Sequence, residues 1–158
     1  MRMLTCLVAS VATFAEAQAT ELPKQGEDSY TTDYVVTSMK ATKFGDRTVT
    51  QIEFAGVSHN DAGGTMFDKL GARCIGFGEN GASHGDCVDV DKDGDQIFTT
   101  YETPGPSGKP GTGVHHYVGG TGKYAGISGD ADFSAMPVKS ADGTVLFIVP
   151  HKAKWKLP

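Results

Sequence analysis

Hydrophobic and polar residues alternate along much of this chain, most clearly near its C-terminal end. Ala131, Phe133 and Ala135 would share one face of an extended strand, and the polar residues between them would share the other. The segment 152–157 alternates lysine with alanine, tryptophan and leucine in the same way. The pattern predicts strands that each have one dry and one wet face.

Strand-like runs recur along the rest of the chain and are separated by turns that contain glycine. Gly45, Gly94 and Gly143 each lie beside an aspartate between two runs, and glycine supplies the positive φ that tight hairpins need. Many short, antiparallel strands with one wet face favour a closed or nearly closed barrel, and we predict no helix beyond a short turn within 62–70. The predicted strands are 30–41, 47–57, 72–77, 84–90, 96–102, 113–118, 124–133 and 144–157, the last divided at Pro150.

Five glycines punctuate residues 119–129, which predicts two strands joined at a tight corner. Residues 120–125 match the glycine spacing of a dinucleotide-binding loop, but the glycine-rich residues that follow cannot open the helix which that loop requires. A phosphate-binding P-loop is excluded because Lys123 is followed by Tyr124 instead of serine or threonine. The segment therefore informs about the fold and indicates no nucleotide site.

The first nineteen residues have the pattern of a secretory signal peptide. Arg2 precedes a short apolar run that ends at Phe14, and Ala17-Gln18-Ala19 resembles a cleavage site. Residues 20–158 are then expected to form one exported barrel domain, in a periplasm or outside the cell. We expect no membrane insertion, because no apolar run reaches the roughly 20 residues that span a bilayer. The net charge of −5 argues against a nucleic-acid partner, which needs clustered lysine and arginine.

Cysteine usage agrees with export. Cys6 would leave with the signal peptide, so that Cys74 and Cys87 remain in a compartment where disulfides persist. We predict a bond between them, and the alternative is a pair of buried free thiols. Neither cysteine has the closely spaced partners of a zinc site.

Residues 89–95 form an acidic run that resembles the start of a calcium loop. Acids occupy its first, third and fifth positions, but Thr100 stands where such a loop has its bidentate glutamate. A solvated hairpin turn is the favoured interpretation, and weak calcium binding is the alternative. The candidate metal ligands are Asp89, Asp91, Asp93 and Asp95.

Polar residues on inward-facing strand positions are the other candidates for chemistry. A carboxylate in an apolar barrel has a raised pKa and can act as a general acid or base, with a tyrosine donating a hydrogen bond. We take Glu53, Tyr101 and Glu102 as candidate catalytic residues. Adjacent residues on a strand point to opposite faces, so at most one of His115 and His116 faces the interior. The candidates for ligand contact are Phe98, His116, Tyr124 and Trp155.

Residues 91–98, residues 119–129 and the terminal strand with its tryptophan together resemble the bacterial allene oxide cyclase-like barrel proteins, which are related in fold to plant allene oxide cyclases and dirigent proteins. The resemblance implies an all-β fold, a single eight-stranded antiparallel β-barrel with a central cavity. It also implies a possible homo-oligomer, because the plant relatives often form trimers. The plant cyclases use inner polar groups that include a glutamate, and the sequence matches no glutamate of this chain to it.

We expect the exported barrel to bind a small apolar or aromatic molecule in its cavity. One alternative is a cofactor-free isomerase or cyclase that uses acid and base groups in the cavity. Another is a structural or protein-interaction barrel whose interior is filled by side chains. No cofactor is expected apart from the calcium alternative.

Overall fold

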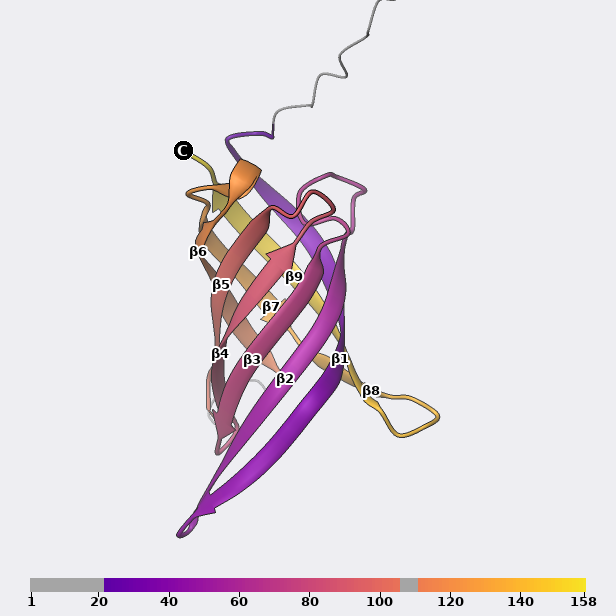
Figure 1. The fold of residues 1–158 in the computed structure, drawn as a ribbon, viewed down its shortest axis with the longest axis vertical. Helices are drawn as coiled ribbons and strands as arrows, with labels where there is room; N and C mark the ends of the chain where they lie inside the picture. The colour runs from indigo at the N-terminus through magenta and orange to yellow at the C-terminus, as the bar shows by residue number, and fades with distance from the viewer. Residues whose placement is uncertain (1–21, 106–110) are drawn as a thin grey trace, which may run out of the picture.

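The computed structural model describes residues 22–105 and 111–158, and they form a closed antiparallel barrel of eight strands with one extra strand (Figure 1). The fold predicted from the sequence is confirmed. The predicted signal peptide and cleavage site lie outside the described residues. The strands are β1 (Gln25–Phe44), β2 (Arg47–Asn60), β3 (Gly71–Glu79), β4 (Ala82–Val90), β5 (Gln96–Thr103), β6 (Thr112–Gly120), β7 (Ser128–Ser134), β8 (Met136–Lys139) and β9 (Val145–Lys156).

Each strand from β1 to β6 pairs with the next one along the chain, and β9 closes the barrel by pairing with both β7 and β1. The short strand β8, which the sequence pattern did not reveal, continues the line of β7 along the same edge of β9. The predicted division of the last strand at Pro150 is wrong. Pro150 lies opposite the break between β7 and β8, where β9 has no partner on that side. Proline is tolerated at such a place, because it has no amide hydrogen to donate to a neighbouring strand.

The glycine-rich segment forms the predicted corner, although not with the predicted strand boundary. A 3-10 turn, η1 (Gly122–Tyr124), stands between β6 and β7, so the seventh strand begins at Ser128 instead of residue 124. Gly122 and Gly126 have φ of 53° and 76° there, which favours glycine. Turns with positive φ at Gly45, Gly94 and Gly143 confirm the predicted hairpins.

The loop between β2 and β3 fills the barrel interior at one end with its side chains, and we call this end the packed end. Phe67, 2% exposed, stacks on Tyr30 and Tyr117 with ring centroids 4.6 and 5.4 Å apart. The loop is held inward by Ser58, whose hydroxyl donates to the Phe67 carbonyl at 2.8 Å, and by Asn60, whose amide donates to the Met66 carbonyl at 2.8 Å. Where the sequence suggested only a short turn, the chain therefore forms a plug.

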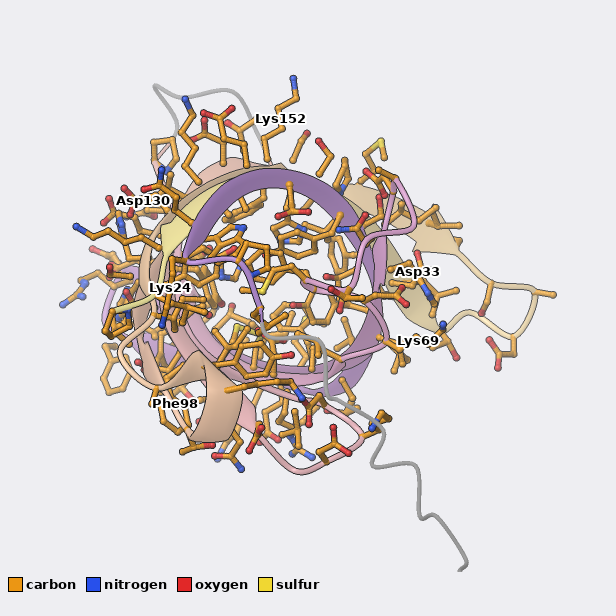
Figure 2. All side chains as sticks on the ribbon, turned by 90° about the horizontal axis from the view of Figure 1, so that it is seen from above. Lys24, Asp33, Lys69, Phe98, Asp130 and Lys152 are labelled. Atoms are coloured by element: carbon orange, nitrogen blue, oxygen red, sulfur yellow. A yellow bond between two sulfur atoms is a disulfide. The ribbon has the colours of Figure 1, made fainter. Side chains whose placement is uncertain are left out.

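At the opposite end, which we call the hollow end, the β1/β2 hairpin extends past the other strands (Figure 1). Charged side chains point away from the wall around the whole barrel, among them Asp33, Asp130 and Lys152 (Figure 2). The predicted disulfide is present between Cys74 and Cys87, which face each other across β3 and β4 with Cα atoms 4.1 Å apart. Among the described residues, no helix combines the length and the apolar character needed to cross a membrane.

Candidate functional site

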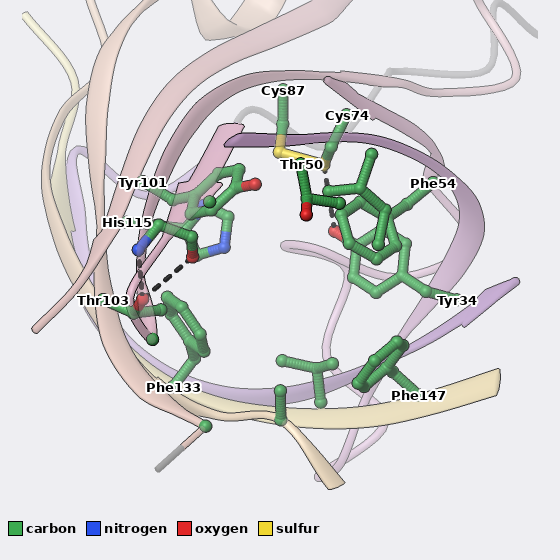
Figure 3. A pocket seen from close by; sticks show the side chains of 17 residues that line it. Tyr34, Thr50, Phe54, Cys74, Cys87, Tyr101, Thr103, His115, Phe133 and Phe147 are labelled. Carbon is green, nitrogen blue, oxygen red and sulfur yellow. Dashed lines mark hydrogen bonds between the residues drawn. A yellow bond between two sulfur atoms is a disulfide. The ribbon is translucent and has the colours of Figure 1, made fainter. Parts of the chain in front are cut away.

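The hollow end contains a cavity of about 340 Å³. Its wall is mostly aromatic and aliphatic: Tyr101, His115 and Phe133 approach from one side, and Tyr34 and Phe147 from the other (Figure 3). Few polar groups interrupt this surface, as is usual for sites that bind small apolar molecules. The lining residues are Tyr34, Thr50, Ile52, Phe54, Cys74, Gly78, Gly81, Ser83, Cys87, Tyr101, Thr103, Gly111, His115, Phe133, Ala135, Phe147 and Val149.

Two glycines make room for Tyr101, which lines the cavity from β5. Gly76 and Gly85 pair with each other across β3 and β4, and Gly85 also pairs with Tyr101. A Cβ atom at Gly76 would overlap the Tyr101 hydroxyl, and one at Gly85 would lie 2.6 Å from the ring carbon Cε1. The tyrosine ring therefore occupies the space that side chains at Gly76 and Gly85 would fill.

The polar groups of the cavity include two tyrosines and a histidine, besides the hydroxyl groups of Thr50, Ser83 and Thr103. The Tyr34 hydroxyl donates to Cys74 Sγ at 3.6 Å, so the disulfide is part of the wall. The Tyr101 hydroxyl makes no hydrogen bond with any described residue, and burial raises its pKa. His115 Nδ1 lies 3.3 Å from Thr99 Oγ1. Each of these groups can form a hydrogen bond with a bound molecule.

Both interior histidines are neutral at ordinary pH. Burial, together with a smaller effect of the neighbouring His116, lowers the pKa of His115 to about 4. Burial likewise lowers the pKa of His151, which stacks on Tyr30 at 4.3 Å, to about 3. The His115 ring is thus a neutral hydrogen-bonding group on an aromatic wall, because charging it inside the barrel is unfavourable.

A carboxyl group lies inside the barrel between the cavity and the plug. Asp89 shares the inner face of β4 with the cavity-lining Cys87, two residues away. Its side chain is half-buried, and it pairs across β3 and β5 with Ala72 and Ile97, which are buried inside the barrel. Desolvation raises the pKa of Asp89 to about 7. Burial raises the pKa of Tyr30 and Tyr34, and the charge of Asp89 adds a smaller contribution in the same direction. Near neutral pH this group can therefore hold or release a proton.

No protein-family model matches this chain, and no curated protein matches it. Among solved structures, a pterocarpan synthase dirigent protein is similar to it with a TM-score of 0.51 and 14% sequence identity, over 93% of this chain and all of the other. The barrel has the dirigent fold. At this identity the likeness extends to the fold alone. It confirms the dirigent part of the resemblance seen in the sequence, and the narrower relation to the bacterial allene oxide cyclase-like proteins stays a prediction.

The dirigent-type barrel brings one of the three candidate catalytic residues to its cavity. Tyr101 lines the cavity, whereas Glu53 and Glu102 lie on the outer face, where Glu53 pairs with Arg73 at 2.5 Å. The strand phase explains this, because Phe54 and Tyr101 point inward and their neighbours on the same strands point outward.

The candidates for ligand contact lie elsewhere. Phe98 is on the outer face (Figure 2), and His116 is also outside, 2.6 Å from Asp130. Tyr124 and Trp155 are buried at the packed end with the plug. Of the two adjacent histidines, His115 lines the cavity. The residue pattern along β6 did not indicate which of the two would face inward.

The acidic turn of the dirigent-type barrel surrounds a lysine. Asp91 pairs with the Lys123 ammonium, and Asp93 and Asp95 lie 3.2 and 3.7 Å from it. Asp89, the fourth candidate metal ligand, faces the interior and is not part of this group. Within residues 22–105 and 111–158, no group of three or more histidine, cysteine, aspartate or glutamate residues is arranged to hold a metal ion. The ammonium group of Lys123, a residue of η1, therefore links η1 to the β4/β5 turn through ion pairs.

Asp89 is the interior group whose role the sequence obscured. Its position two residues before Asp91 makes it look like part of the acidic turn. The available signal was its alternation with Cys87, a residue expected to be buried in a disulfide, which places Asp89 on the inner face.

Proposed function

We propose that this protein is an exported barrel that binds a small, largely apolar or aromatic molecule in the cavity at its hollow end and holds it in one orientation. The observation that supports this most strongly is the cavity itself, about 340 Å³ in volume, with an aromatic wall and a few hydrogen-bonding groups. A barrel of eight strands is wide enough to hold one small ligand. The alternative of a completely filled barrel fits the packed end only.

Export is part of the proposal. The disulfide between Cys74 and Cys87 supports it, because such bonds persist in oxidising compartments. The signal-like first nineteen residues support it independently. We therefore place the protein in a periplasm or outside the cell.

A cavity-filling variant tests the binding proposal. Gly78 lines the cavity, and a Cβ atom there would approach its nearest neighbour, the Ala82 carbonyl, no closer than 3.5 Å. Gly78→Leu should therefore fill the cavity at small structural cost. We expect N-phenyl-1-naphthylamine, a neutral apolar fluorophore, to brighten on binding the wild-type protein and to bind Gly78→Leu at least tenfold more weakly.

The control is Gly71→Leu, on the outer face of the same strand, where a Cβ atom also has room, at 3.8 Å from the Val90 carbonyl. This variant should bind the fluorophore as wild type does. Equal binding by all three proteins would place the fluorophore outside the cavity and contradict the proposal.

Asp89 favours a second candidate, a cofactor-free isomerase or cyclase of the allene oxide cyclase-like type. With a pKa of about 7 in an apolar interior, Asp89 suits general acid or base catalysis at neutral pH. The Tyr34 and Tyr101 hydroxyls, which line the cavity, could donate hydrogen bonds to charge that develops on a bound molecule. A binder would return its ligand unchanged, whereas an enzyme would convert it and would lose rate, but not affinity, in Asp89→Asn.

A further inference from the structure

The β1/β2 hairpin continues the wall of the cavity beyond the closed part of the barrel. β1 pairs with β9 only as far as Val35, and β2 pairs with β3 only from Thr50 onward. The residues between these points, 36–49, pair with each other across the hairpin and have no further strand beside them. The hairpin therefore stands out from the rim of the hollow end (Figure 1).

A bulge in β1 decides which side chains the hairpin presents to the cavity. The pairing register shifts between Val36 and Ser38, so Thr37 is an extra residue. Beyond it, Met39 pairs with Ile52, whose side chain lines the cavity. Residues paired across antiparallel strands share a face, so Met39 extends the apolar wall outward. Met39 is 65% exposed and has room to contact a ligand.

The same face ends in a positive charge. Ala41 pairs with the cavity-lining Thr50, and Lys43 follows two residues farther out, opposite Thr48. Two residues of a strand span about 7 Å, so Lys43 lies one short step beyond the mouth. Lys43 has no hydrogen bond or ion pair with any described residue. The face thus runs from the aromatic cavity through Met39 to the ammonium group of Lys43.

We infer that the inner face of the hairpin is a second subsite, and that the ligand is an elongated amphiphile whose apolar body enters the cavity and whose anionic end binds Lys43. This inference rests on the proposed function, because the apolar body needs the cavity. Without the bulge, Lys40 and not Lys43 would share the face of Ile52. The extra residue therefore places a thioether next to the cavity and a charge farther out.

Displacement of N-phenyl-1-naphthylamine by decane-1-sulfonate and by decan-1-ol, both below their micelle-forming concentrations, tests this assignment. The two competitors share a chain and differ in the charge of the head group. We expect Lys43→Gln to weaken binding of the sulfonate about two- to fivefold, which is the range of exposed ion pairs, and to leave the alcohol unchanged. Added salt should weaken only the sulfonate.

Lys40→Gln is the matched control, because Lys40 lies on the same strand but on the outer face. It should change the binding of neither competitor. Equal effects of the two lysine substitutions, or no effect of either, would overturn the inference and leave the proposed function standing, provided that the fluorophore still binds. Failure of the fluorophore to bind wild type would overturn both.

Discussion

Asp89 is the residue at which the surroundings change the chemistry most. An exposed aspartate is ionised at neutral pH, whereas burial raises the pKa of Asp89 to about 7. The pKa values of the buried His115 and His151 are lowered instead, because burial disfavours the charged form of every group, and the charged form of histidine is the protonated one. At pH 6 the Asp89 carboxyl group and the rings of His115 and His151 are therefore mostly neutral.

The pH dependence of stability should reveal the Asp89 proton. Between the ordinary value of 3.8 and the folded value of about 7, the unfolded chain has lost this proton and the folded chain keeps it. Raising the pH through this window therefore favours the unfolded chain. Asp89→Asn should gain stability relative to wild type from about pH 4 to about pH 7, and the gain should be constant above that. Urea unfolding at a series of pH values measures the difference in the free energy of unfolding between the two proteins. Both contain the same histidines, so the histidine contributions cancel. A difference independent of pH would contradict the prediction.

At the scale of elements, the loop 61–70 is a core element although it has no regular secondary structure. Phe67 and Lys69 adopt positive φ of 58° and 55°, which turns the chain inward over the barrel end. Such backbone conformations are unfavourable for side-chain-bearing residues and persist only where the surroundings stabilise them. Burial of Phe67 and Leu70, each 2% exposed, provides that stabilisation.

Removing the plug side chain should destabilise the whole barrel. Phe67→Ala deletes a ring that stacks on two tyrosines, and large-to-small changes of this kind reduce the free energy of unfolding by about 3–5 kcal/mol. Phe44→Ala, at a hairpin-tip residue that is 60% exposed, should change it by less than about 0.5 kcal/mol. Chemical unfolding compares the two variants. A plug that was a loose surface loop would give two equally small effects.

At the scale of the molecule, the barrel is divided into a packed and a hollow half. The aromatic cluster around Phe67 fills one half, and the second core cluster, formed by Cys74, Cys87 and Tyr101, lies beside the cavity. The disulfide joins two strands in the hollow half, where fewer side chains meet across the barrel. Its removal should cost about 3 kcal/mol by the loop-entropy estimate, and it therefore helps to stabilise the part of the wall that packs least.

Export and disulfide formation can be checked together on the full chain. Expressed in a bacterial host with an export pathway, the protein recovered from the periplasm should begin at Thr20 and be two hydrogens lighter than its reduced form. Denaturing mass spectrometry of the whole protein, with and without a reductant, measures both values, and native mass spectrometry is recorded on the same sample. A molecule that survives on the native ion would also identify a ligand directly. An intact N-terminus with free thiols would contradict the proposed location.

Local patterns in the sequence were sufficient for most of the strands, for the hairpins and for the inward phase of residues such as Ala131 and Trp155, but they missed β8 and the start of β7. These features depend on neighbours along the chain, where alternation and turn chemistry act directly. The disulfide could also be predicted, because removal of the signal peptide leaves only two cysteines. The candidate site was predicted less well, since Tyr101 faces the cavity but Glu53 and Glu102 do not.

The sequence by itself determined an all-β barrel with dry and wet strand faces and one disulfide. Only the tertiary structure decided which end is hollow, that Asp89 faces inward, and that Met39 and Lys43 follow the cavity wall. These outcomes depend on contacts between strands far apart in the chain: a plug loop that reaches across the barrel, glycines on two strands that admit a tyrosine from a third, and a bulge that reverses the faces of a hairpin. Alternation within one strand contains no information about such contacts, because it specifies two faces without specifying what each face meets.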